Sequence, residues 1–210
     1  EALSLYGKMQ LDESVYPSKY TLVAVLKACS QLTDLECGCR IHDEIIKKGS
    51  LENDLVVGSA LVHMYAQCGL LTKAQAVFDK LLMRDGISWN VLLTGYAKHG
   101  HNHEVMKCFE QMHIENLIPD AITFLCLLNA CGHLGRLDEA QMNFNSMTRK
   151  YGILPNLEHY TCMIMVFGNA GHFDEVISMI EMMPSSNNPV VWLALANACK
   201  KWGNVKLGRL

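Results

Sequence analysis

Apolar residues recur at intervals of three or four along nearly the whole chain, and short polar stretches interrupt them. After Gly86, for example, Leu92 and Tyr96 belong to one apolar stripe, and Val105 and Met112 belong to the next. This spacing is typical of amphipathic α-helices, whose period is about 3.6 residues. No Asn-Gly or Asp-Gly turn joins two alternating runs, so strand signals are absent. The pattern predicts pairs of antiparallel helices.

The helix pairs recur along the chain, and a glycine after the first stripe marks each one. These glycines are Gly69, Gly100, Gly135, Gly171 and Gly203, at successive intervals of 31, 35, 36 and 32 residues. Glycine suits the end of a helix because the chain often adopts a positive φ there. The stretch without this glycine, Thr33-Asp-Leu-Glu36, predicts a capping box at the start of a second helix. Pro17, Pro119 and Pro155 fall between the expected units, where a helix must stop.

A helix pair of this size cannot bury its apolar face alone, so neighbouring pairs are expected to stack into a right-handed or left-handed superhelix. The predicted fold is therefore an all-α solenoid. Tetratricopeptide repeats have a constant period of 34 and a Trp-x-x-Leu-Gly-x-x-Tyr opening, which this chain lacks. The expected units are 1–18 (the second helix of a truncated unit), 19–54, 55–85, 86–120, 121–156, 157–188 and 189–210 (the first helix and turn of a last unit).

Composition limits the function. The chain has 210 residues, of which 50% are hydrophobic and 19% charged, with a net charge of −3, so disorder is excluded. The longest apolar stretches, such as Ala121–Leu128, are far shorter than the roughly 20 residues that span a bilayer. The near-neutral charge argues against binding of nucleic acid mainly through counterion release. Glu1 lies inside an expected helix and no stop signal precedes Leu210, so we expect both ends to be cut and any targeting segment to be missing.

The nine cysteines are odd in number, lie mostly in apolar runs and form no Cys-x-x-Cys pair. We interpret them as reduced, buried small hydrophobes in an intracellular compartment. Nothing in the sequence indicates a cofactor.

Several phrases, in this order, give the chain a specific resemblance. They are Val25-Leu-Lys-Ala-Cys29, Val57-Gly-Ser-Ala-Leu-Val-His-Met-Tyr-Ala-Gln-Cys-Gly69, Ser88-Trp-Asn90, Gly95-Tyr-Ala97, Ile118-Pro-Asp120, Ile122-Thr-Phe124, Tyr151-Gly-Ile153 and Leu157-Glu-His-Tyr-Thr-Cys-Met163. The chain resembles plant pentatricopeptide repeat (PPR) proteins of the PLS subclass, which alternates standard, long and short repeats. The segment 19–54 resembles a long repeat, 55–85 a short one, 86–120 a standard one, 121–156 a long one and 157–188 a short one. The segment 189–210 resembles the start of the E-type extension of organellar RNA-editing factors.

The resemblance implies a right-handed superhelical solenoid of antiparallel helix-pair repeats. It also implies sequence-specific binding of single-stranded organellar RNA, one base per repeat, to guide C-to-U editing or other processing of transcripts in a mitochondrion or chloroplast. The fragment itself is expected not to be an enzyme, to bind no membrane, and to rely on a deaminase domain in cis beyond it or in trans. The alternative is a peptide-binding helical-repeat scaffold for protein partners.

In this family the fifth and the last residue of each repeat read the base. The fifth residues are Val23, Ser59, Asn90, Leu125 and Thr161, and the last residues are Ser18, Asp54, Asp85, Asp120, Asn156 and Asn188. An ionised Asp only accepts hydrogen bonds, so it favours the ring N–H of guanine or uracil, whereas Asn can donate to adenine or cytosine. Ser or Thr leaves room for a purine, and Asn fits a pyrimidine.

These pairs predict a base for each repeat. Ser59 with Asp85 should select G, Asn90 with Asp120 should select U, and Thr161 with Asn188 should select A. Val23 and Leu125 cannot form hydrogen bonds, so their preferences should be slight. If the RNA runs 5′ to 3′ along the chain from the N- to the C-terminus, the footprint is weak–G–U–weak–A. The residues that flank the base are expected to be Tyr20, Val56, Ile87 and Ile122, whose faces suit stacking, while Glu158 departs from this pattern.

Simpler readings compete with these. Asp at a helix boundary is often only a cap, so Ser59, Asp85, Asn90 and Asp120 have a purely structural alternative. His42-Asp-Glu44 fits half of a zinc deaminase motif, but no Pro-Cys-x-x-Cys follows, so catalysis there is not expected. The cluster of His99, His101 and His103 fits an inter-helix turn better than a metal site. Trp89 and Trp192 are expected in the core.

Overall fold

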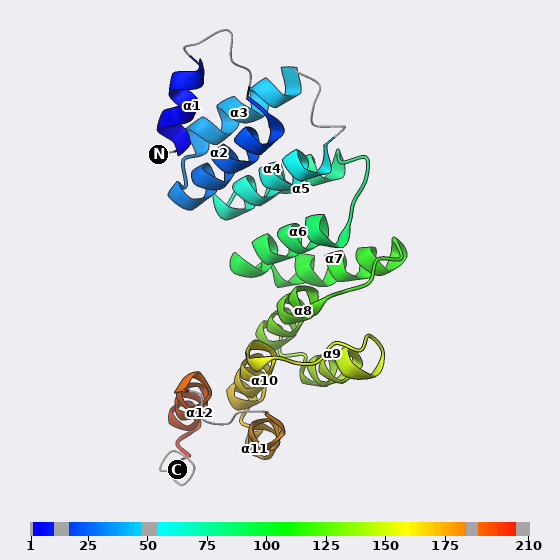
Figure 1. Ribbon diagram of the computed structural model, residues 1–210. Coiled ribbons are helices and arrows are strands. Elements are labelled where there is room, and N and C mark those ends of the chain that lie inside the picture. Colours follow the sequence, from blue (N-terminus) through cyan, green and yellow to red (C-terminus); the bar gives the residue numbers. More distant parts are fainter. Residues whose placement is uncertain (1, 11–16, 48–53, 184–188, 205–210) are drawn as a thin grey trace. The chain divides into compact units, whose positions relative to one another are not determined.

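The computed structural model describes residues 2–10, 17–47, 54–183 and 189–204, and within these ranges the chain forms twelve α-helices and no strand (Figure 1). They fall into two compact units, residues 1–99 and 100–210. Each unit is built from antiparallel helix pairs. The expectation of an all-α fold of helix-pair repeats is therefore confirmed.

Six helices form the first unit. They are α1 (Ala2–Gln10), α2 (Lys19–Leu32), α3 (Leu35–Lys47), α4 (Leu55–Gln67), α5 (Leu71–Asp79) and α6 (Gly86–Lys98). The first helices of successive pairs pack directly on one another, α2 on α4 and α4 on α6. The second helices α3 and α5 pack on the first helix of their own pair and, more lightly, on the first helix of the next.

The second unit repeats this arrangement. Its helices are α7 (Asn102–Ile114), α8 (Ala121–His133), α9 (Leu137–Arg149), α10 (Leu157–Ala170), α11 (Phe173–Met182) and α12 (Pro189–Trp202). Here α8 packs on α10 and α10 on α12, while α9 and α11 lie against α8 and α10.

The first helices begin at residues 19, 55, 86, 121, 157 and 189, which are the first residues of the expected units. Pro17, Pro119 and Pro155 each precede the N-cap residue of such a helix. The fifth residue of each expected repeat therefore lies just beyond the first turn of its first helix. The assignment of these repeats to long, short and standard classes stays a prediction.

The turn glycines adopt the backbone conformation that the sequence predicts. All five have φ between 65° and 82°. Thr33 occupies the same place in the pair α2 and α3 and also has a positive φ, of 54°. The predicted capping box at Thr33 is wrong, because Asp34 Oδ1 accepts the N–H of Cys37 at 3.1 Å while the Thr33 hydroxyl donates to the carbonyl of Leu32. A left-handed Thr33 ends α2 and cannot also cap α3.

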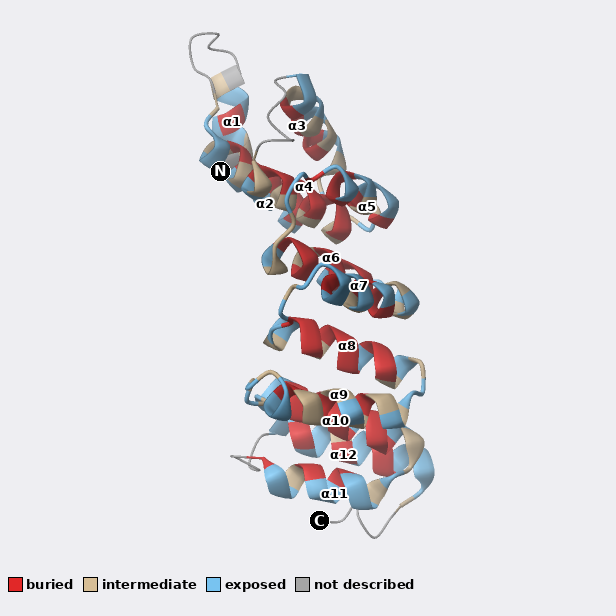
Figure 2. Ribbon diagram, turned by 90° about the vertical axis from the view of Figure 1, so that its right-hand side faces the viewer, coloured by how far each residue is buried: buried red, intermediate tan, exposed pale blue. Residues whose placement is uncertain are grey.

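Burial differs between the two kinds of helix (Figure 2). The first helix α4 is buried around much of its circumference, and Leu61 and Met64 are wholly inaccessible. The second helix α11 buries little more than Val176 and Met179. First helices thus form the interior of each stack, because they contact helices on several sides, whereas second helices need only one apolar stripe.

Small residues allow the first helices to approach closely. A Cβ added to Gly95 on α6 would stand 2.6 Å from the Cβ of Ala66 on α4. The same contact recurs in the second unit, where a Cβ on Gly168 of α10 would stand 2.7 Å from that of Ala198 on α12. Since real Cβ atoms do not come this close, a larger side chain would force these helices apart.

The nine cysteines are all free, and seven of them are buried, with Cys39 and Cys68 half-buried. The expected burial is confirmed for those seven, and their redox state stays a prediction. Trp89 is buried edge-on against Phe78, with ring centroids 4.6 Å apart, as expected. Trp192 is 40% exposed, so its expected place in the core is wrong. None of the helices within the described residues combines the length and apolarity needed to cross a bilayer.

Candidate nucleic-acid interface

The residues expected to end each repeat are the N-caps of the next first helix. Each cap side chain accepts a hydrogen bond from a backbone N–H two or three residues further on, at 2.8–3.2 Å; the caps are Ser18, Asp54, Asp85, Asp120 and Asn156. Of the four residues with a purely structural alternative, Asp85 and Asp120 are therefore caps, whereas Ser59 and Asn90 lie within α4 and α6. Asn188 lies outside the described residues. Capping uses one oxygen of a carboxylate, and the same side chain retains a second one, so capping does not by itself exclude base reading.

Three of these caps are reciprocal boxes, which fix the side chain in one orientation. Asp85 Oδ1 accepts the N–H of Ser88 at 2.8 Å, while the Ser88 hydroxyl accepts the N–H of Asp85 at 3.0 Å. Asp120 and Asn156 form equivalent boxes. At Asn156 the partner is the buried His159, whose Nε2 donates to the carbonyl of Ala121 on α8 at 2.8 Å. A side chain held in this way is pre-organised for any ligand that reaches its remaining polar atoms.

Both carboxylate oxygens of Asp54 have partners. Its Oδ2 lies 3.4 Å from the Nζ of Lys19, the first residue of the same expected repeat. Burial acts to raise the pKa of Asp54, but the N–H groups of Val57 and Val56 together with Lys19 outweigh it and hold the pKa below its usual range. With an ion pair at Asp54 and an apolar Val23 at the fifth position, this repeat has little capacity to select a base by hydrogen bonding.

The fifth residues lie on the first helices but differ in accessibility. Val23, Ser59, Leu125 and Thr161 are half-buried, whereas Asn90 is only 7% exposed. The open position expected for Asn90 is thus not what the structure has. The Thr161 hydroxyl donates its proton to the carbonyl of Leu157, at 2.8 Å. This hydroxyl is therefore left only as an acceptor for the expected base.

Some of the expected pairs share a unit. Ser59 lies on α4 and Asp85 caps α6, which packs on α4. Leu125 on α8 and Asn156 at the start of α10 are related in the same way. Asn90 and Asp120 belong to different units.

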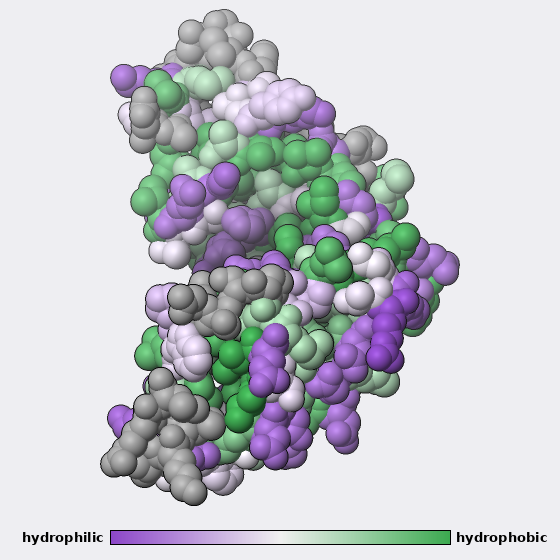
Figure 3. Space-filling view, turned by 60° about the horizontal axis from the view of Figure 1, so that its bottom comes forward, coloured by the Kyte–Doolittle hydropathy of each residue, from purple (hydrophilic) through white to green (hydrophobic). Residues whose placement is uncertain are grey.

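The residues expected to flank a base are apolar and exposed. Tyr20 is 74%, Val56 53%, Ile87 71% and Ile122 52% exposed. Figure 3 shows, on one face of the molecule, apolar side chains among hydrophilic ones. These four share the second position of a first helix, so the repeats 19–54, 55–85, 86–120 and 121–156 each have one exposed apolar side chain there. Glu158 is also exposed at this position.

Two residues of the histidine cluster, His99 and His101, contact other groups of the fold. His99 Nε2 donates to the carbonyl of Ala66 at the end of α4, at 2.9 Å, and His101 lies 3.9 Å from Glu104. In the second unit the indole of Trp202 donates to the carbonyl of Gly168 at 3.1 Å, so the same kind of link joins two successive first helices. Among the described residues, no three His, Cys, Asp or Glu side chains are grouped to hold a metal.

In the deaminase-like motif His42-Asp-Glu44, the two end residues contact different neighbours. His42 Nδ1 pairs with the hydroxyl of Tyr65 at 2.8 Å, whereas Glu44 accepts from Tyr6 on α1 at 2.8 Å. The two side chains are therefore committed to different neighbours. The cluster of His42, Tyr65, Cys39 and Lys73 is a feature that the sequence reasoning missed, because its members come from three helices.

Family comparisons agree with this architecture. The "PPR repeat" model matches residues 59–85, 122–151 and 158–188, and the "PPR repeat family" model matches residues 84–133. Together these matches cover more than half of the chain. The chain therefore belongs to the pentatricopeptide repeat family.

Relatives and solved structures add detail. A pentatricopeptide repeat-containing protein of Arabidopsis thaliana, At2g13600, is 40% identical over 99% of this chain and 30% of its own length. The chloroplastic CRR2 of the same plant is 39% identical over 99% of this chain and 32% of its own length, and the mitochondrial At1g06140 is 39% identical over 95% and 36%. The chain thus spans about a third of the length of these relatives.

Among solved structures, PPR10 from maize is 27% identical, with a TM-score of 0.64 over 92% of this chain and 28% of that one. PPR10 in complex with an 18-nucleotide psaJ RNA element has a TM-score of 0.73 at 21% identity, over 97% of this chain and 31% of that one. These likenesses support the helical-repeat fold of the chain.

Proposed function

We propose that this chain binds single-stranded RNA, one base per repeat, as the specificity-determining part of an organellar RNA-processing factor. The observation that carries the proposal is the regular series of side-chain caps at the starts of successive first helices, with a fifth residue on each helix. After four of the five caps the second residue is apolar and exposed, and after Asn156 it is Glu158. A recurring polar cap with an apolar contact in most repeats suits a ligand whose own polar edges and flat faces recur at regular intervals.

The relatives support the class of ligand and the compartment. The solved complex of PPR10 contains an RNA element, and the names of two relatives place them in the chloroplast and the mitochondrion. The PLS arrangement expected for 19–188, followed by the E-type extension expected from 189, favours C-to-U editing as the processing step. The chain itself then supplies recognition, needs no cofactor, and leaves the deamination to a domain in cis or in trans.

The expected base order is weak–G–U–weak–A. Repeat 55–85 carries the firmest prediction, because Ser59 is half-buried and Asp85 is held by its capping box. Repeat 86–120 depends on Asn90, which is 7% exposed and so must gain access when RNA binds. Its selectivity for U should accordingly be weaker than the selectivity of repeat 55–85 for G.

Selection of RNA from a random pool by the purified chain tests the proposal. The enriched sequences should contain G followed by U, and Ser59→Asn should move the preference at the first of these bases from G toward U. Asn90→Ser should move the second from U toward G. Each change should alter relative affinity by about 1–3 kcal/mol, the scale of one good base-edge contact. A pool that shows no enrichment, or enrichment that neither substitution moves, would refute base reading, and binding of peptides in place of RNA would favour a protein-binding scaffold.

A further inference from the structure

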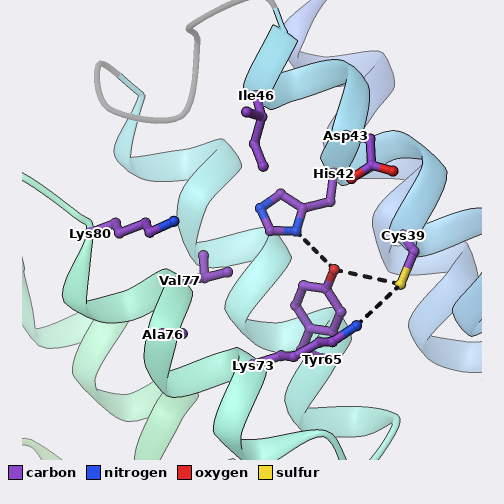
Figure 4. Close-up of a pocket in the computed structure, with 9 residues that line it drawn as sticks. All are labelled: Cys39, His42, Asp43, Ile46, Tyr65, Lys73, Ala76, Val77 and Lys80. Atoms are coloured by element: carbon purple, nitrogen blue, oxygen red, sulfur yellow. Dashed lines mark hydrogen bonds between the residues drawn. The ribbon is translucent and has the colours of Figure 1, made fainter.

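A cavity of about 390 Å³ lies between the second helices α3 and α5 and is floored by α4 (Figure 4). It forms because α3 and α5 both pack on α4 and leave a gap between them. His42 and Ile46 line it from α3, Tyr65 from α4, and Lys73 and Val77 from α5, with Lys80 directly after α5. Its volume is within the range of small-molecule sites, roughly 300–1,000 Å³.

The imidazole of His42 is held in one orientation inside this cavity. Its Nδ1 lies 2.8 Å from the hydroxyl of Tyr65, and the rings meet edge to face with centroids 5.4 Å apart. Burial, aided by Cys39, raises the pKa of Tyr65, so the phenol stays neutral and can either donate to or accept from Nδ1. The other ring nitrogen, Nε2, is turned toward the side of the cavity where the Lys80 ammonium lies (Figure 4). When Nδ1 accepts from Tyr65, Nε2 carries a proton and is a donor.

The charged side chains that line the cavity are two lysines and one aspartate. Burial lowers the pKa of His42, Asp43 opposes this effect, and Lys80 and Lys73 each lower the pKa further. Lys73 Nζ stands 5.6 Å above the Tyr65 ring and 4.0 Å from Cys39 Sγ. Within the part of the chain that the structure describes, no carboxylate lies within ion-pair distance of Lys73 or Lys80. Asp43 is the acidic residue that lines this cavity, so two lysines face one carboxylate.

The cavity also has an apolar side. Ile46, Ala76 and Val77 line it, and Figure 4 shows Val77 on the side of His42 that faces Lys80, and Ile46 above the imidazole. An anion alone would leave this apolar surface uncovered. A ligand with a charged end and a compact apolar body fits both parts.

We propose that this cavity binds a phosphate monoester, with the phosphate between Lys80 and His42 and the organic group against Ile46 and Val77. A phosphate monoester carries close to two negative charges at neutral pH and accepts several charge-assisted hydrogen bonds. His42 Nε2 and the Lys80 ammonium donate two of them. Lys73 lies on the other side of His42 and adds to the attraction through space. The ester is either a free small molecule or the 5′-phosphate of an RNA. The site is independent of base reading, because it lies between second helices and the caps lie at the starts of first helices.

Binding should raise the pKa of His42, since an anion beside Nε2 favours the imidazolium that the two lysines otherwise oppose. Proton and nitrogen resonances of the histidine rings can be followed in the 210-residue chain from pH 5 to 8, with and without phenyl phosphate. The His42 titration midpoint should rise by about one pH unit, which is a tenfold change in proton affinity. Inorganic phosphate should give the same change at higher concentration, because it lacks the apolar contact.

Substitutions make the assignment specific. Lys80→Gln should weaken phenyl phosphate binding by about tenfold or more, the factor of one charge-assisted hydrogen bond, and Lys73→Gln should weaken it less. Lys47→Gln is the matched control, because Lys47 is exposed on α3 and does not line the cavity. If Lys80→Gln and Lys47→Gln weaken phenyl phosphate binding equally, the binding is due to general charge attraction and the proposed site is refuted. A His42 titration midpoint that does not change on binding would also refute the site.

Two RNA oligonucleotides of one sequence, with and without a 5′-phosphate, distinguish the two sources of the ester. Tighter binding of the phosphorylated one, abolished by Lys80→Gln, would assign the site to an RNA end. Equal binding of both, with phenyl phosphate still bound, would assign it to a free small molecule. Loss of base selectivity in either RNA would count against the proposed base reading and would leave the phosphate site unaffected.

Discussion

Asp85→Asn separates the capping role of Asp85 from its proposed base-reading role. As a cap, Asp85 uses Oδ1 to accept the N–H of Ser88 at 2.8 Å. An Asn side chain offers the same oxygen in the same place, and Asn and Asp are nearly equivalent at N-caps. As a base reader, Asp85 only accepts hydrogen bonds, whereas Asn also donates. The substitution therefore keeps the cap and changes the reader.

The magnitudes follow from this geometry. Losing the negative charge at the start of α6 should lower the free energy of unfolding by about 0.3–1 kcal/mol, the size of an interaction with the helix dipole. Asp85→Ala removes the cap as well and should cost about 0.5–2 kcal/mol. On the RNA, Asp85→Asn should move the preference of repeat 55–85 from G toward A by about 1–3 kcal/mol, because Asn can donate to the ring nitrogen of adenine.

Urea unfolding and affinities for four RNAs that differ at this one base measure both effects. Asp79→Asn is the matched control, since Asp79 lies at the end of α5, accepts from Gln75 at 2.7 Å, and carries the same charge. Asp79→Asn should change the affinity for all four RNAs by the same factor. If Asp85→Asn folds as well as the parent and still prefers G, Asp85 is only a cap, and the reading role assigned to the last residue of this repeat is refuted.

Four other outcomes are expected. Thr33→Gly should raise the free energy of unfolding by about 1 kcal/mol, because Thr33 has a positive φ that glycine adopts without strain. The reverse change at the equivalent position, Gly69→Thr, should lower the free energy of unfolding by a similar amount or more. Calorimetry that shows no gain for Thr33→Gly would contradict this. Gly95→Leu should lower the free energy of unfolding by at least about 1–3 kcal/mol, since even a Cβ there would overlap α4. Gly86→Ala should not destabilise the chain, because there is open space around Gly86. Equal losses for the two variants would show that the close approach of the helices is unimportant. His42 has a lowered pKa in the folded chain, so stability should fall as the pH drops below the unfolded-state value of about 6.5, and His42→Gln should flatten this slope in urea titrations from pH 7 to 5. RNA affinity should depend only modestly on salt, because 18 basic residues face 21 acidic ones and each neutralised phosphate adds only roughly −0.7 to the slope; a slope equivalent to roughly six phosphates would reveal a local basic field.

The sequence by itself determined the repeat and its phase. The spacing of Gly69, Gly100 and the later turn glycines predicts where each helix pair turns, and the prolines predict where the next pair begins. Both signals are local, because a positive φ and a missing N–H act on the residue that carries them. The helix starts therefore agree with the sequence, and so does the placement of Asp85 and Asp120 at helix boundaries.

Only the tertiary structure decided how accessible each polar side chain is. Ser59 and Asn90 hold the same position in their repeats, yet one is half-buried and the other is 7% exposed. Trp89 and Trp192 also share a position and differ in the same way. Burial depends on the neighbouring helices that cover a residue, and a periodic pattern within one helix does not contain that information.

The cavity beside His42 shows the same limit most clearly. His42, Tyr65 and Lys80 come from α3, α4 and the end of α5, and nothing in their spacing along the chain marks them as neighbours. They meet because two second helices pack on one first helix and leave a gap above it. The sequence determined which helices exist, and the packing of three of them decided which side chains share a site.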